Sequence, residues 1–84
     1  MNMPIEFLRR LGPGPRAINA CTIALRCPDI FELESGDFAI IGKDITADAA
    51  PKLPPSAGCG PDERIVLLPR KTLVLAKPDI PERI

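Results

Sequence analysis

The chain contains no histidine, tryptophan or tyrosine, and only three of its 84 residues are phenylalanine. Without histidine it cannot form Ser-His or Cys-His nucleophile pairs or histidine-ligated metal centres, which excludes most hydrolase and metalloenzyme templates. So few aromatic rings also leave little material for stacking on nucleic-acid bases. We therefore predict no catalytic residues, no metal and no cofactor, and expect Phe31 and Phe38 to serve in the core.

Long apolar segments are also missing. No stretch approaches the ~20 apolar residues that cross a bilayer, and the N-terminus lacks the cationic start and apolar run of a secretory signal. The three cysteines, an odd number, are Cys21, Cys27 and Cys59. Without an export signal, this pattern favours reduced thiols over a disulfide framework. We expect a cytoplasmic protein that does not associate with membranes.

The net charge is zero, but the charges are unevenly placed. Residues 1–28 carry +3, residues 29–63 carry −6, and residues 64–84 carry +3. A neutral chain is a poor general binder of nucleic acid, because that affinity comes largely from lysine and arginine neutralising phosphates. The alternating sign instead suits pairing within the chain or between subunits.

Proline and glycine, by contrast, are abundant, with 11 and 6 residues respectively. This content excludes long helices and places much of the chain in turns and extended connections. A single domain of this length buries only about 60% of the surface that its unfolded chain exposes, so its stability margin is thin.

The strongest fold signal lies between Cys27 and Thr46. Asp29-Ile-Phe-Glu-Leu33 and the apolar run Phe38-Ala-Ile-Ile41 flank the turn-forming residues 34–37, which predicts a β-hairpin. We expect Phe31 and Leu33 to share one face with Phe38 and Ile40 across that turn. A capped helical turn beginning at Asp29 is the alternative.

A second apolar concentration runs from Arg64 to Lys77. Residues 65–68 are apolar on both faces, which predicts a strand over 64–68 that ends, bulges or lies at an edge at Pro69. Residues 72–76 either extend it or form a helix that starts at Pro69, and the β-branched Thr72 and Val74 favour strand. Residues 78–84 are expected to be an extended tail.

The N-terminal segment has residues typical of the start and end of a short helix over residues 3–11. Asn2 is a candidate N-cap, Pro4 falls in the first turn, and Gly12 and Pro13 follow the end. Residues 16–26 are ambiguous between a helix and a strand over 21–25, and we favour the helix. The expected organisation is a docking helix and Pro/Gly spacer over residues 1–15, followed by one small globular domain over 16–84.

Together these segments predict an α+β fold with a small antiparallel sheet. Its strands lie near 30–33, 37–43, 64–68 and possibly 72–76, and its short helices near 3–11 and 16–26. Two strands carry apolar side chains on both faces, and so short a chain cannot bury both faces with its own helices. This indicates that a second copy of the chain, in a homo-oligomer, or a protein partner covers the remaining face. The docking segment would contribute four partner-binding residues, Ile5, Phe7, Leu8 and Leu11.

One stretch resembles a known family. Arg64-Ile-Val-Leu-Leu-Pro-Arg-Lys-Thr-Leu73 is similar to the arginine, apolar strand, proline and basic-turn pattern of the AbrB-like swapped-hairpin DNA-binding proteins, which are intertwined dimers. The resemblance implies DNA contacts by Arg64, Arg70 and Lys71. Here the strand 38–41 precedes the motif instead of following it, and the glycine-led loop and helix expected next are absent, so we do not assign the chain to that family.

The sequence therefore predicts a non-catalytic interaction or accessory module that acts through self-association or a protein partner, with no identifiable small-molecule substrate. A small dimeric DNA-binding regulator that uses Arg64, Arg70 and Lys71 is the alternative. An acid-base or cation-binding pair among Asp29, Glu32, Asp37 and Asp44 is disfavoured, because an aspartate beside a glycine is more often turn chemistry.

Overall fold

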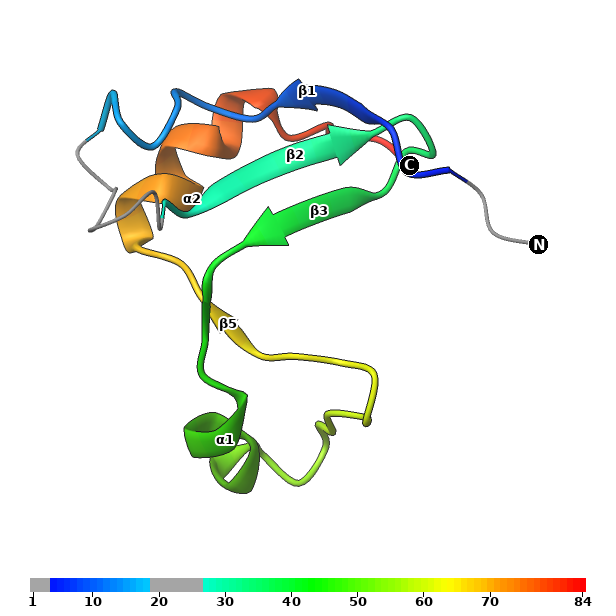
Figure 1. Ribbon diagram of the computed structural model, residues 1–84, viewed down its shortest axis with the longest axis vertical. Helices are drawn as coiled ribbons and strands as arrows, with labels where there is room; N and C mark the ends of the chain where they lie inside the picture. The colour runs from blue at the N-terminus through cyan, green and yellow to red at the C-terminus, as the bar shows by residue number, and fades with distance from the viewer. Residues whose placement is uncertain (1–3, 19–26) are drawn as a thin grey trace.

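The computed structural model describes residues 4–18 and 27–84 and confirms a small α+β fold (Figure 1). A three-stranded antiparallel sheet has the order β1-β2-β3, and a separate two-stranded sheet pairs β4 with β5. The strands are β1 Phe7–Arg10, β2 Asp29–Leu33, β3 Phe38–Ile41, β4 Lys43–Asp44 and β5 Val66–Leu67. The helices are α1 Thr46–Ala49 and α2 Arg70–Ala76, with 3-10 turns η2 Ala50–Lys52 and η3 Lys77–Asp79.

The predicted hairpin is present as β2 and β3. The N–H of Leu33 donates to the Asp37 carbonyl at 2.8 Å, and the N–H of Gly36 donates to the Leu33 carbonyl at 2.9 Å. Gly36 has φ +92°, the left-handed conformation that the last residue of a three-residue hairpin loop adopts at little cost only when it is glycine. The loop is thus residues 34–36, one residue shorter than expected.

That one-residue difference reverses the predicted sharing of faces. Phe31 lies opposite Ala39, while Ile30 lies opposite Ile40, so the expectation that Phe31 shares a face with Phe38 and Ile40 is wrong. We call the side with Ile30 the Ile30 face; it also carries Leu11, Arg9, Glu32, Phe38 and Ile40. We call the other side the Phe31 face; it carries Phe7, Arg10, Asp29, Phe31, Ala39 and Ile41.

The helix predicted over residues 3–11 is wrong, because residues 7–10 form the edge strand β1. β1 pairs with β2 in the register Phe7 to Leu33 and Arg10 to Phe31, with a bulge between Phe7 and Arg9. Pairing supplies this segment with hydrogen-bond partners across the sheet, which a short isolated helix would not obtain. The N-terminal segment is therefore part of the sheet.

The strand predicted over residues 72–76 is also wrong, and the alternative, a helix starting at Pro69, is correct. Pro69 is the N-cap of α2, and its carbonyl accepts the N–H of Thr72 at 3.0 Å. Thr72 and Ala76, four residues apart and hence on one helical stripe, are the two buried positions of α2. The helix predicted over 16–26 lies mostly outside the described residues, and residues 16–18 belong to a turn.

The segment after α2 is held against β1 instead of trailing away as the predicted tail. The Asp79 carboxylate accepts the N–H of Gly12 at 2.7 Å, and the Arg9 guanidinium donates to the Asp79 carbonyl at 2.7 Å. Gly12 also lies against the backbone of Leu75 and Ala76. These contacts position α2 on the Ile30 face.

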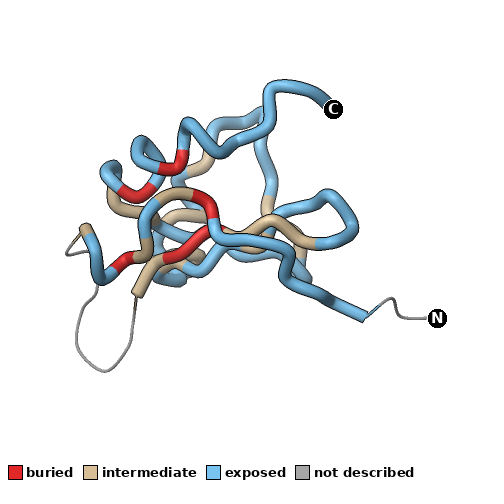
Figure 2. Tube along the Cα trace, turned by 90° about the horizontal axis from the view of Figure 1, so that it is seen from above, coloured by how far each residue is buried: buried red, intermediate tan, exposed pale blue. Residues whose placement is uncertain are grey.

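The core is very small and lies where α2 meets the sheet. Leu11, Ile30 and Ala76 are its buried hydrophobic residues, with Leu68 packed against them. In Figure 2 the buried positions gather where α2, the end of β1 and the start of β2 meet, and most of the remaining described chain is exposed. Figure 1 shows the β4–β5 pair and α1 projecting away from this core.

Candidate functional site

The most unusual property of the molecule is the amount of surface that it exposes. The accessible area is 7037 Å², whereas a folded monomer of this 9.1 kDa mass exposes about 4,900 Å². The radius of gyration is 14.3 Å, compared with about 12 Å expected for a compact chain of this length. The excess surface, about 2,100 Å², is the candidate for a functional surface.

Much of this surface is apolar and comes from four regions. The described large hydrophobic residues that are exposed include Ile5, Phe7 and Leu8 near β1, Phe38, Ile40 and Ile41 on β3, Val66 and Leu67 on β5, and Leu73, Val74 and Leu75 on α2. Contiguous apolar patches of this extent on a monomer mark interaction sites or aggregation hazards. The prediction that the chain cannot cover its own apolar faces matches this exposure.

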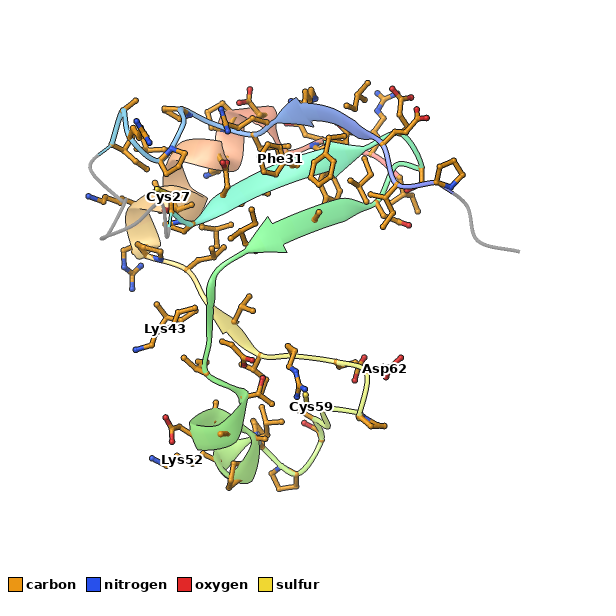
Figure 3. All side chains as sticks on the ribbon, in the orientation of Figure 1. Cys27, Phe31, Lys43, Lys52, Cys59 and Asp62 are labelled. Carbon is orange, nitrogen blue, oxygen red and sulfur yellow. The ribbon has the colours of Figure 1, made fainter. Side chains whose placement is uncertain are left out.

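The Phe31 face carries an organised cluster. The Phe7 and Phe31 rings meet edge to face with centroids 5.0 Å apart, and the Arg10 guanidinium carbon lies 5.1 Å from the Phe31 ring centroid. Arg10 also forms an ion pair with buried Asp29 at 3.0 Å. Figure 3 shows Phe31 in the middle of the three-stranded sheet. No helix in the described part of the chain covers this face, because α2 lies on the opposite one. The contacts among Phe7, Arg10, Asp29 and Phe31 are therefore the main side-chain packing described on the Phe31 face.

The four residues predicted to bind a partner do not behave alike. Ile5 is 73% exposed, and Phe7 and Leu8 are each about half exposed, whereas Leu11 is only 4% exposed. Leu11 packs with Ile30 and Ala76 in the core, so on the single chain its side chain is not presented to a partner. The exposed three lie on or beside the edge strand β1.

The residues predicted for DNA contact lie on two segments. Arg64 precedes β5 and is 3.9 Å from the Asp44 carboxylate, with both side chains well exposed. Arg70 and Lys71 form the first turn of α2, where positive charge interacts unfavourably with the helix dipole. The segment between them forms only the two-residue strand β5, and the strand–turn pattern of the resembling family is not reproduced.

Three of the four acidic side chains that the sequence singled out are already engaged. Asp29 pairs with Arg10, Glu32 accepts a hydrogen bond from Arg9 at 2.8 Å, and Asp44 accepts the N–H and hydroxyl of Thr46 at 3.0 and 2.7 Å. Among residues 4–18 and 27–84, no group of three or more Asp, Glu or Cys side chains is placed to hold a metal ion. These carboxylates serve local structure.

The surroundings of Asp44 favour the ionised form of its carboxyl group. The pKa of its carboxyl is lowered below the ordinary value of 3.8, mainly by the Thr46 hydroxyl, then by the Thr46 N–H and the charge of Arg64. The Thr46 hydroxyl in turn accepts the N–H of Ile65 at 2.8 Å. This arrangement ties the start of α1 to the strand β5.

Replacing Thr46 tests that arrangement. A carboxyl with a lowered folded-state pKa stabilises the fold above its unfolded pKa, and this contribution is lost as the pH falls through the lowered value. In Thr46→Val, NMR titration of the Asp44 carboxyl should show its pKa moving up toward 3.8, with a smaller loss of stability on acidification. Thr46→Ser keeps the hydroxyl and should keep the lowered pKa; an unchanged pKa in the valine variant would contradict the assignment.

The cysteines divide into two kinds. Cys27 is disulfide-bonded, so the prediction of a reduced thiol is wrong at this position. Cys59 is free and partly exposed, and its thiol donates to the Glu63 carbonyl at 3.4 Å. Figure 3 shows Cys59 in the loop that precedes β5, on the part of the chain that projects from the core.

Within the described residues, no helix has the length and apolar character required to span a membrane. Comparison of the chain with protein-family models, curated proteins and solved structures gave no match. The functional proposal therefore rests on the exposed apolar surface and the contacts described above.

Proposed function

We propose that the protein is a non-catalytic interaction or accessory module that acts by associating with a second copy of itself or with a protein partner. The observation that supports this proposal is the excess of about 2,100 Å² of accessible surface over that of a compact monomer. Obligate homodimers and permanent complexes bury 2,000 Å² or more in total over both partners. One chain thus exposes enough surplus surface to form such an interface.

The nature of the surplus supports association over catalysis. Three buried hydrophobic residues form the core of the described chain, which is little apolar burial to set against the conformational entropy of ordering 84 residues. An interface that covers β3 and the residues near β1 would add the missing burial. The binding surface in this proposal comprises the Phe31 face, β3, and the exposed residues Ile5, Phe7 and Leu8.

Native mass spectrometry of the gently purified protein tests the proposal. We expect a mass at a whole multiple of the 9.1 kDa chain, or the chain plus a stoichiometric second protein. Spectra recorded at low and high ionic strength provide a control, because an apolar interface persists in salt whereas loose charge pairing does not. A bare monomer at micromolar concentration, with no co-purifying chain, would contradict the proposal.

DNA binding through Arg64, Arg70 and Lys71 is the second and weaker proposal. Arg64 already has an acidic neighbour in Asp44, and the neutral chain supplies little of the phosphate-neutralising charge that non-specific DNA affinity requires. This role would require duplex binding that weakens steeply with added salt and is lost when the three residues are changed. Absence of binding at low salt would eliminate it.

The compartment in which the module acts is also a proposal. The sequence predicts the cytoplasm, whereas a disulfide at Cys27 is typical of oxidising compartments. Thiol labelling of the protein in intact cells, before and after reduction, distinguishes these possibilities. Labelling of all three cysteines without reduction would support the cytoplasm.

A further inference from the structure

β3 is an edge strand whose outer side is open in the part of the chain that the structure describes. It stands last in the order β1-β2-β3. Leu33 and Asp37 form a hydrogen-bonded pair, and such pairs alternate along an antiparallel ladder, so Ala39 and Ile41 direct their backbone groups toward β2. The backbone N–H and C=O groups of Phe38 and Ile40 therefore point outward, where they can accept another strand.

The two edges of the sheet differ in their protection against strand addition. β1 has a bulge between Phe7 and Arg9 and carries two adjacent arginines, and bulges and charges are devices that discourage edge-to-edge pairing. β3 pairs with β2 without a register shift and consists of Phe38-Ala-Ile-Ile41, with no proline and no charge. The unprotected edge is the one suited to pairing.

We propose that β3 pairs antiparallel with β3 of a second copy of this chain, which joins the two three-stranded sheets into one sheet of six strands. This inference rests on the proposed function and identifies the partner as the chain itself. In such a pair, related by a two-fold axis through β3, each contact that one copy makes is repeated by the other. The pairing buries the exposed side chains of Phe38 and Ile40 against their counterparts.

The strand is complementary to itself in one register. With Ala39 opposite Ala39 at the axis, Phe38 of one copy lies opposite Ile40 of the other, and both outward-pointing backbone pairs are satisfied. Phe38 and Ile40 share the Ile30 face, so each pair joins an aromatic ring to a β-branched side chain, which is a favourable cross-strand combination. The small Ala39 suits the close approach of a non-hydrogen-bonded pair at the axis.

The flanking charges favour the antiparallel orientation. Asp37 immediately precedes β3, and Lys43 follows it after Gly42. With Ala39 at the axis, antiparallel pairing brings Asp37 of one copy diagonally across from Lys43 of the other, with Asp44 one residue farther from the axis, whereas parallel pairing would set Asp37 beside Asp37. Figure 3 shows Lys43 on the segment that leads away from β3, where β4 begins.

The first test compares two β-branched residues of similar exposure. Ile40 and Val74 are 49% and 55% exposed, but Ile40 lies on β3 beside Phe38, whereas Val74 lies on α2 outside the proposed binding surface. We expect the wild-type protein to have twice the 9.1 kDa chain mass by light scattering. Ile40→Lys should weaken dimerisation at least tenfold, while Val74→Lys should leave the dimer largely intact. Far-UV circular dichroism of each variant establishes that it is folded.

The second test reads the register directly. A non-hydrogen-bonded pair has its Cα atoms about 4.5 Å apart, within the range that a disulfide spans. In a Cys59→Ser background, Ala39→Cys should form a covalent dimer with oxidised glutathione. Phe38→Cys should not, because in this register the two Phe38 positions lie on opposite sides of the axis, beyond disulfide reach.

The outcomes separate this inference from the proposed function. A dimer that Ile40→Lys dissociates and Ala39→Cys cross-links supports β3 pairing. An oligomer that is unaffected by Ile40→Lys, or that cross-links through Phe38→Cys instead, overturns the pairing while the interaction role stands. A chain that purifies only with a different protein also overturns it, and a bare monomer overturns both.

Discussion

Gly12→Ala is expected to be among the most damaging single substitutions in this protein. Gly12 has φ +75°, a conformation that costs a residue with a side chain about 1–2 kcal/mol. A Cβ at this position would also lie 3.0 Å from the Ala76 Cα and the Leu75 carbonyl oxygen. Both are backbone atoms of α2, so neither can move without shifting the helix off the sheet.

The two effects together predict a loss of about 2–4 kcal/mol in the free energy of unfolding. At roughly 4–8 °C per kcal/mol for a domain of this size, the thermal midpoint should fall by at least about 8 °C. Gly58→Ala is the matched control, because a Cβ there meets nothing within 4 Å and no positive φ is involved. A Gly12→Ala midpoint within experimental error of the Gly58→Ala midpoint would show that α2 is not packed as described.

Ile30→Ala is the second substitution with a large expected effect. Ile30 is the only residue of the three-stranded sheet among the three buried hydrophobic residues of the described chain, and it contacts elements from both ends of the sequence. Truncating a buried isoleucine to alanine typically costs 2–5 kcal/mol. In a core this small, we expect a value near the upper part of that range and extensive unfolding at 37 °C.

Urea denaturation provides the measurement, with Ile84→Ala as the control for the same chemical change at a fully exposed site outside the proposed binding surface. The exposed variant should stay within about 0.5 kcal/mol of the wild type. Ile30→Val removes one methylene and should cost about 0.5–1.5 kcal/mol. Equal losses for Ile30→Ala and Ile84→Ala would mean that the core lies elsewhere.

Local signals were sufficient to predict the β2–β3 hairpin. A turn rich in Ser35, Gly36 and Asp37 between two apolar runs indicates a hairpin because these residues adopt the required backbone conformations. The register was not predictable to one residue, because residues 34–37 fit both a three- and a four-residue loop. As a result the faces of Phe38 and Ile40 were interchanged with those of Ala39 and Ile41.

The ends of the chain were mispredicted because long-range contacts decide their conformation. The helix signals before Gly12 are genuine, but Phe7 finds its strand partner at Leu33, far beyond any local pattern. At Thr72 the preference of β-branched residues for strands was outweighed by the start signal of Pro69 and by burial of Thr72 and Ala76 on one helical stripe.

The sequence predicted that apolar surface would be left exposed, but it did not predict which residues would form that surface. The shortage of cover for two apolar strands follows from chain length and pattern, and the structure locates the exposed residues on β3, near β1 and on α2. Leu11 was expected with the exposed group and is buried. The contacts of Asp79 with Arg9 and Gly12 had no local signal, since they join residues 70 and 67 positions apart.

Those contacts have a consequence for the order of events during synthesis. During synthesis the N-terminal part of a chain is available to fold first. Contacts between residues distant in sequence form late because closing the intervening loop costs entropy. The sheet has all its strands once Ile41 is made, but α2 and Asp79, which cover the Ile30 face, belong to the last part of the chain. Between the synthesis of Ile41 and that of Asp79, nascent chains would therefore carry a sheet whose Ile30 face and β3 edge are both uncovered.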